Sequence, residues 1–154
     1  ALGELLATVL EELQPASLEK RLTVHLHADH DRALRRAAPA GPGLMRIALR
    51  NVLENAVRHS PAGGEIGVRV ESGQNGEDIA VTVEDQGPGL APDQRARALD
   101  RGWRGGGEGQ GLGLAIVASV MARTGGTIAL DAADSGGLRV TLRWLSSPRP
   151  AGSA

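Results

Sequence analysis

Three short segments rich in asparagine or glycine follow one another along the chain, and they constrain its fold more than any other feature. They are Asn51-Val-Leu-Glu-Asn55, Asp85-Gln-Gly87-Pro-Gly89 and Gly109-Gln-Gly111-Leu-Gly113-Leu114. The first lies in a helical pattern, the second follows a strand pattern, and the third opens an apolar helical pattern. Together they predict one pocket built from a helix, a strand end and a helix N-terminus.

Composition limits the kind of protein this can be. The 154 residues suit one domain, and the 17 basic and 18 acidic residues nearly cancel, which argues against a nucleic-acid or membrane-surface role. There are no cysteines, and no apolar run approaches the roughly 20 residues of a membrane span. Phe and Tyr are absent. We therefore expect a soluble domain with a core of Leu, Val, Ile and Ala, in which a nucleotide base is held largely without aromatic stacking.

Periodicity predicts an α+β sandwich. Helices are expected over 2–13, where Pro15 marks the end, and over 44–59, 92–99 and 112–123; strands are expected over 22–27, 66–70, 79–83, 127–130 and 138–145. Hairpin-linked strands with one polar face predict a mixed, mostly antiparallel sheet of about five strands, covered on one face by three helices. Residues 1–145 form the expected domain, with a short mobile lid over 101–110 and a disordered tail over 146–154.

The helix over 44–59 carries a polar stripe beside its apolar face. Asn51, Asn55, Arg58 and His59 occupy positions i, i+4, i+7 and i+8. A solvated helix face is one explanation, but asparagine is a poor helix former and two of them in mid-helix need a reason. Amide oxygens suit Mg²⁺, Arg58 can reach a phosphate, and His59 can pack against a base or ribose. The stripe therefore indicates one wall of a ligand site.

Asp85 follows a strand pattern and precedes two glycines. An ordinary Asp-containing turn is one interpretation. The other is a recognition site, because a carboxylate accepts a hydrogen bond from the amino group of adenine and would repel the carbonyl of guanine. Gly87 and Gly89 allow close backbone approach and positive φ. The segment therefore predicts a preference for ATP over GTP.

The third segment opens a helix. Free N–H groups and the helix dipole make such a terminus an anion site, although a glycine run can also be a plain linker. A dinucleotide-binding loop is excluded because the segment follows a glycine-rich stretch and not a strand. Arg104 and Gln110 flank the loop, where they can meet a terminal phosphate when the lid closes.

The motifs, their order and their spacing resemble the catalytic ATP-binding domain of two-component sensor histidine kinases. This domain has the Bergerat fold and belongs to the GHKL superfamily, which includes gyrase, the 90-kDa heat-shock chaperone and the mismatch-repair ATPases. LRNVLENAVRHSPAGGEI is similar to the N box, VEDQGPGL to the G1 box and GQGLGLAIV to the G2 box. The similarity extends from the first helix to about Leu145.

The resemblance implies roles for individual residues. Asn55 would bind Mg²⁺ with support from Asn51, Arg58 would lie near the phosphates, and His59 would pack on the base. Asp85, Gly87 and Gly89 would form the adenine site. Arg104 and Gln110 would meet the γ-phosphate, and the phosphate-facing loop would comprise Gly109, Gly111, Leu112, Gly113 and Leu114.

The chain departs from the family pattern in three places. Leu99 and Gly102 replace the expected phenylalanines, which Trp103 can offset, and Gly137-Leu138 stands for the usual Gly-Thr. The phosphoacceptor motif His-Glu-x-Arg/Lys-Thr-Pro is absent. The remaining histidines, which we interpret as ordinary surface or core-edge residues, are His25, His27 and His30.

The resemblance implies an ATP- and Mg²⁺-dependent protein-histidine kinase that phosphorylates a histidine on a separate dimerisation domain, with a response regulator downstream. We expect a monomeric fragment, a homodimeric parent and a cytoplasmic location as part of a membrane sensor. Alternatives of the same fold are a non-catalytic ATP-binding regulator and an anti-sigma-type serine kinase. A gyrase- or chaperone-type ATPase is disfavoured. The resemblance implies that those members carry a water-activating glutamate at the position of Asn51.

Overall fold

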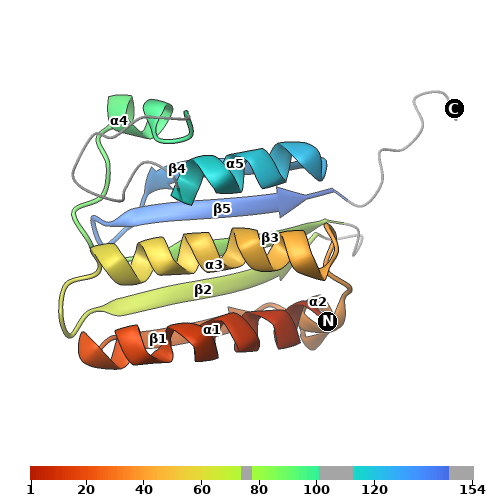
Figure 1. Ribbon diagram of the computed structural model, residues 1–154, viewed down its shortest axis with the longest axis horizontal. Coiled ribbons are helices and arrows are strands. Elements are labelled where there is room, and N and C mark those ends of the chain that lie inside the picture. The colour runs from red at the N-terminus through yellow and green to blue at the C-terminus, as the bar shows by residue number, and fades with distance from the viewer. Residues whose placement is uncertain (74–77, 101–112, 146–154) are drawn as a thin grey trace, which may run out of the picture.

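The computed structural model describes residues 1–73, 78–100 and 113–145, which form a helical layer packed on a sheet (Figure 1). In chain order the elements are α1 (Leu2–Glu19), β1 (Thr23–Ala28), α2 (Asp31–Arg35), α3 (Pro42–His59), β2 (Glu65–Ser72), β3 (Ile79–Glu84), α4 (Pro92–Arg97), α5 (Gly113–Arg123), β4 (Gly126–Ala132) and β5 (Leu138–Trp144). The predicted lid over 101–110, most of the turn between β2 and β3, and the tail over 146–154 lie outside the described residues.

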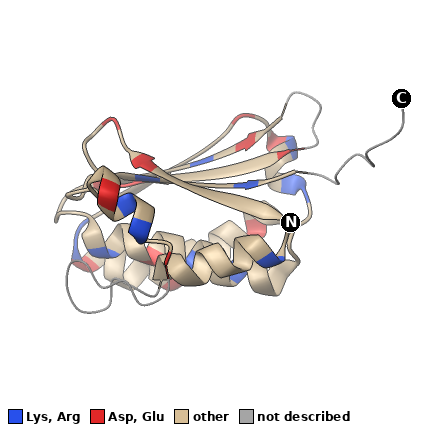
Figure 2. Ribbon diagram, turned by 90° about the horizontal axis from the view of Figure 1, so that it is seen from above, with Lys and Arg blue, Asp and Glu red and all other residues tan. Residues whose placement is uncertain are grey.

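The five strands form one mixed sheet in the order β1-β2-β3-β5-β4. β1 runs parallel to β2, and all other neighbouring pairs are antiparallel. The three long helices α1, α3 and α5 lie on one side of this sheet, and none of the described helices covers its other side (Figures 1 and 2). The predicted fold class, a mostly antiparallel sheet covered on one face by three helices, is confirmed.

The core lies between the two layers and follows the predicted periodicity. The apolar stripe of α3 is buried throughout: Met45, Leu49, Val52, Leu53 and Ala56. The inward face of β5 is buried as well: Leu138, Val140, Leu142 and Trp144. Burying an aliphatic side chain of this size contributes about 1.5–3 kcal/mol, so these stripes fix which face of each element meets the other layer.

One local prediction is wrong, and one short helix was not predicted. α1 does not end at Pro15 but continues to Glu19. A proline in a helix interior removes one hydrogen bond, and here the last turn is held at its end, where the N–H of Lys20 donates to the carbonyl of Ala16. The second difference is α2, which was not predicted. Its five residues are too few to show a helical period.

Candidate nucleotide site

The polar stripe of α3 faces the beginning of α5. Asn51 Nδ2 donates to the carbonyl oxygen of Ile47 at 2.8 Å, so its Oδ1 keeps its lone pairs. A Cβ placed on Gly113 would lie 3.7 Å from that Oδ1. An amide oxygen therefore stands beside the first turn of α5. Asn55, one turn further along α3, is half-buried like Asn51.

Arg58 lies at the rim of this stripe. Its side chain is half-exposed, and its Nη2 lies 3.9 Å from Oε1 of Glu54, one turn earlier on α3. A pair at this distance and exposure contributes little to stability and is easily rearranged. Arg58 therefore shares the α3 wall with the two asparagines but points toward Glu54.

His59 ends α3 and is half-buried. Burial lowers the pKa of His59 below its usual 6.5; the nearby Asp85 carboxylate acts in the opposite direction, and the charges of Arg58 and Lys20 lower the pKa further. Burial therefore favours the neutral form of the imidazole. A neutral, half-buried ring beside Asp85 suits the predicted contact with a base.

Asp85 follows the end of β3 and is only 3% exposed. Its Oδ1 accepts hydrogen bonds from the N–H of Gly87 at 2.9 Å and the N–H of Leu138 at 3.2 Å. Across residues 1–73, 78–100 and 113–145, no buried polar side-chain atom lacks a partner. Oδ2 accepts no hydrogen bond from the described residues and therefore reaches solvent. One oxygen of the carboxylate holds the turn, and the other remains available to a ligand.

At two positions around this turn, another part of the backbone comes so close that only glycine fits. A Cβ on Gly87 would lie 2.5 Å from the carbonyl oxygen of His59, and a Cβ on Gly137 would lie 1.9 Å from the carbonyl oxygen of Asp85. Gly89 has the expected positive φ of 66°, whereas Gly87 does not, so that part of the prediction is wrong. Gly87 is needed for space, since the turn packs directly on the end of α3.

Sequence reasoning missed the residues that brace Asp85 from the β4–β5 hairpin. Ser135 Oγ donates to the carbonyl oxygen of Asp85 at 3.1 Å, and the N–H of Asp85 donates to the carbonyl of Leu138 at 3.1 Å. The departure from the Gly-Thr pattern at Gly137-Leu138 was the one sequence feature that drew attention to this hairpin. Its link to Asp85 depends on β5 lying next to β3.

Lys20 is a second residue that sequence reasoning missed. Its Nζ donates to the carbonyl oxygens of Val57, Arg58 and Ser60 at 2.9, 2.7 and 3.1 Å. A lysine between a helix and a strand carries no recognisable motif. In the structure it holds the end of α3, where His59 lies.

The described residues bring together one part of the predicted site. The contacts above link Asn51 with Gly113, and His59 with Asp85 and Gly87. Leu114 is buried in the core, so only its backbone can face a ligand. Five other predicted residues lie outside the described ranges: Arg104, Gly109, Gln110, Gly111 and Leu112, together with Gly102 and Trp103 of the lid.

The lid substitution at Leu99 does lie within the described ranges. Its side chain is partly buried and packs against the core, so an apolar contact is kept at this position.

The donor set of α3 fits magnesium better than a softer ion. Within the described ranges, no group of three or more His, Asp or Glu side chains is placed to hold a metal. Amide oxygens are hard ligands, and Mg²⁺ usually keeps several waters and shares phosphate oxygens with the substrate. Asn51 and Asn55 can therefore hold Mg²⁺ together with a nucleotide.

Known proteins are similar to this chain in sequence. Residues 40–148 match the family described as histidine kinase-, DNA gyrase B- and HSP90-like ATPase. Sensor protein QseC of Salmonella typhi is 30% identical over 147 residues, covering 94% of this chain and 31% of QseC. The signal transduction histidine-protein kinase/phosphatase MprB of Mycolicibacterium smegmatis is 39% identical over 99 residues, covering 62% of this chain and 20% of MprB. The chain thus spans about a third or less of these relatives.

Solved structures agree on the fold. The catalytic domain of histidine kinase ThkA superposes with a TM-score of 0.83 at 19% identity, covering 96% of this chain and 95% of that chain.

In the described residues, no helix is long and apolar enough to cross a membrane.

Proposed function

Because the chain belongs to the family of histidine kinase-, DNA gyrase B- and HSP90-like ATPases, and its relatives are sensor histidine kinases, we propose that it binds Mg-ATP and transfers the γ-phosphoryl group to a histidine of a separate domain. The observation that carries this proposal is Asp85, a buried carboxylate with one oxygen fixed by two backbone N–H groups and the other reaching solvent. In this pocket the free oxygen accepts the amino hydrogen of adenine.

The phosphates extend from Asp85 toward α3 and α5. Asn55, with Asn51 beside it, holds Mg²⁺, which neutralises phosphate charge when bound. The N–H groups of the first turn of α5 face the phosphates, and Arg58 leaves Glu54 to contact them. Other residues of the proposed site lie outside the described ranges. Of these, Arg104 and Gln110 contact the γ-phosphate, and the loop around the phosphates comprises Gly109, Gly111 and Leu112.

The proposed reaction is in-line transfer to an external histidine. A ring nitrogen forms a new P–N bond while the bond between the γ-phosphorus and the bridging oxygen breaks, and ADP leaves. Positioning and charge neutralisation carry most of the catalysis. Transfer is favoured over hydrolysis because Asn51, which has no basic group to activate water, faces the start of α5, and Glu54 lies beside Arg58.

The acceptor histidine belongs to a part of the protein beyond this chain. The chain spans 31% of QseC of Salmonella typhi, which leaves room for further domains in a parent of similar length. We propose that the parent is a homodimeric sensor kinase whose cytoplasmic part includes this domain, and that a response regulator receives the phosphoryl group. The isolated domain is a monomer in this proposal.

The first experiment is calorimetric titration of the chain with a non-hydrolysable ATP analogue, with and without Mg²⁺, and with the matching GTP analogue as control. Binding that favours adenine and strengthens with Mg²⁺ supports the proposal. A second assay supplies a histidine phosphoacceptor domain and radiolabelled ATP. Nucleotide binding without any transfer would favour a regulatory ATP-binding module, and absence of binding would contradict the proposed site.

A further inference from the structure

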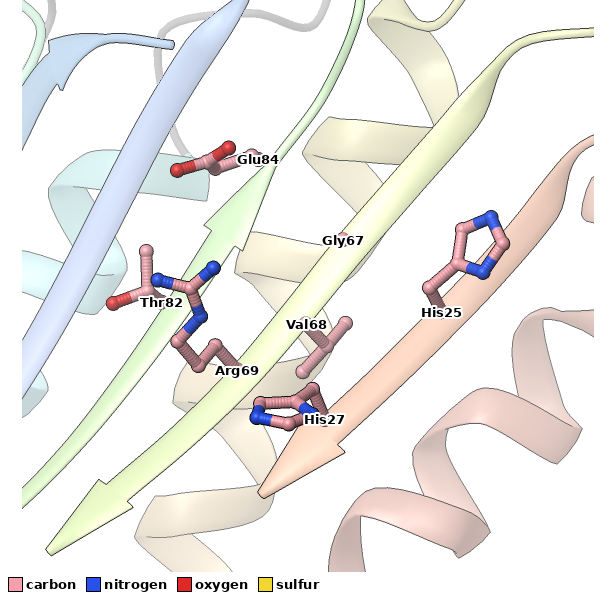
Figure 3. A pocket seen from close by; sticks show the side chains of 7 residues that line it. All are labelled: His25, His27, Gly67, Val68, Arg69, Thr82 and Glu84. Carbon is pink, nitrogen blue, oxygen red and sulfur yellow. The ribbon is translucent and has the colours of Figure 1, made fainter. Parts of the chain in front are cut away.

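The open face of the sheet carries a cavity of about 150 Å³ that the nucleotide site does not use (Figure 3). It lies over β1, β2 and β3, and its lining includes His25, His27, Gly67, Arg69 and Glu84. The three long helices α1, α3 and α5 lie on the opposite side of the sheet (Figure 2). A ligand in this cavity would therefore not compete with one held between α3 and α5.

His25 and His27 occupy alternate positions of β1 and lie on the same face of the sheet. Both are exposed. Alternate residues of a strand are about 7 Å apart, and metal–imidazole bonds are about 2.0–2.1 Å long. Two rings on one strand face can therefore turn onto a single ion.

The neighbouring strand leaves space for this movement. Gly67 is the register partner of His25, and a Cβ placed on it would meet nothing within 4 Å. A larger side chain at this position would stand between the ring of His25 and the middle of the sheet. The glycine is thus one reason why the cavity exists.

A carboxylate lies beside one histidine of the pair. Glu65 Oε1 lies 3.5 Å from His25 Nε2, an arrangement in which the carboxylate orients the ring and leaves Nδ1 for a metal. Glu84 also lines the cavity, where its Oε1 is paired with Nε of Arg139 at 2.5 Å. Arg69 adds a positive charge to the lining, and it lies 3.9 Å from Glu71.

We propose that His25 and His27 form a two-imidazole chelate for a divalent transition ion, of which Zn²⁺, Cu²⁺ and Ni²⁺ are the class that imidazole suits. No third His, Asp or Glu in the described part of the chain completes a protein-only site, so waters fill the remaining positions. This site differs from the proposed magnesium site in both its donors and its side of the sheet.

The test is calorimetric titration of the untagged chain with Ni²⁺ alone. We expect one ion per chain, with affinity reduced by about tenfold or more in His25→Gln and in His27→Gln, each equivalent to at least about 1.4 kcal/mol. Glu65→Gln should weaken binding, and Arg69→Ser should strengthen it. His30→Gln is the matched control, because His30 lies outside the cavity as the N-cap of α2 and should leave the affinity unchanged.

A second readout locates the ion directly. Substoichiometric Cu²⁺ should broaden amide NMR signals of β1 and β2 first, and an excess of Mg²⁺ should not reverse this. The proposal is overturned if the chain shows no one-to-one Ni²⁺ binding, if His30→Gln weakens binding as much as His25→Gln does, or if broadening begins at α3 and not at β1. All variants lie on the surface, and circular dichroism can confirm that each is folded.

Discussion

The Nζ of Lys20 lies 2.7 Å from the carbonyl oxygen of Arg58, at the end of α3. It donates to the carbonyls of Val57 and Ser60 as well. The last carbonyls of a helix have no partner within the helix and carry the negative end of its dipole, so a cation stabilises them. Through this one side chain, the segment after α1 fixes the position of His59 and of the turn that packs on it.

Replacing Lys20 by Met should therefore destabilise the domain. Three charged hydrogen bonds to backbone oxygens are lost while the aliphatic part is kept, and we expect a cost of about 1.5–3 kcal/mol in the free energy of unfolding. Urea denaturation measures it. Arg32→Met is the control, since Arg32 is exposed on α2 and should change stability by less than about 0.5 kcal/mol. Equal effects of the two variants would contradict this role of Lys20.

His59 should make stability depend on pH. Its pKa in the folded chain is below 6.5, chiefly because it is buried, whereas the unfolded chain binds the proton near 6.5. As the pH falls below 6.5, the unfolded state takes up the proton first, and stability is lost until the folded pKa is passed. Between about pH 7.5 and about pH 5.5, the free energy of unfolding should therefore decrease less in His59→Gln than in the wild type.

The control for this pH dependence is the range above about pH 7.5, where the difference in the free energy of unfolding between His59→Gln and the wild type should no longer change with pH. An NMR titration of the His59 ring gives the pKa itself. A ring pKa at or above 6.5 would show that burial does not dominate at this position.

Much of the fold follows from local patterns, but the support of the site does not. The stripe from Met45 to Ala56 predicted α3 and its buried face, because an amphipathic helix of 18 residues repeats its period several times. The contact of Ser135 with Asp85 spans 50 positions and exists only because β5 lies beside β3. No local pattern encodes that pairing. Lys20 is similar, since its partners lie 37 to 40 residues away.

The two oxygens of Asp85 have separate tasks, which Asp85→Asn should distinguish. The amide keeps an oxygen for the N–H groups of Gly87 and Leu138 but replaces the available acceptor by a donor. ATP affinity should fall by about 1.5–3 kcal/mol, with little change in stability. Calorimetric titration with the ATP analogue and urea denaturation measure the two effects.

Asp131→Asn is the matched control for Asp85→Asn. Asp131 lies on β4, exposed and paired in register with Arg139, and its change should leave ATP affinity unaltered. Unchanged ATP affinity in Asp85→Asn would show that the carboxylate does not read adenine. A large loss of stability in that variant would show instead that the amide cannot hold the turn.

Gly137→Ala should disrupt the adenine site by displacing β5, which lies next to β3. The added methyl group would lie 1.9 Å from the carbonyl oxygen of Asp85, so β5 and the turn after β3 must separate. We expect a loss of about 3 kcal/mol or more in the free energy of unfolding, together with loss of ATP binding where the chain still folds. Gly43→Ala in α3 is the control, because a Cβ there meets nothing within 4 Å and alanine should stabilise the helix by about 0.5–1 kcal/mol. Wild-type ATP affinity in Gly137→Ala would mean that the β4–β5 hairpin does not position Asp85.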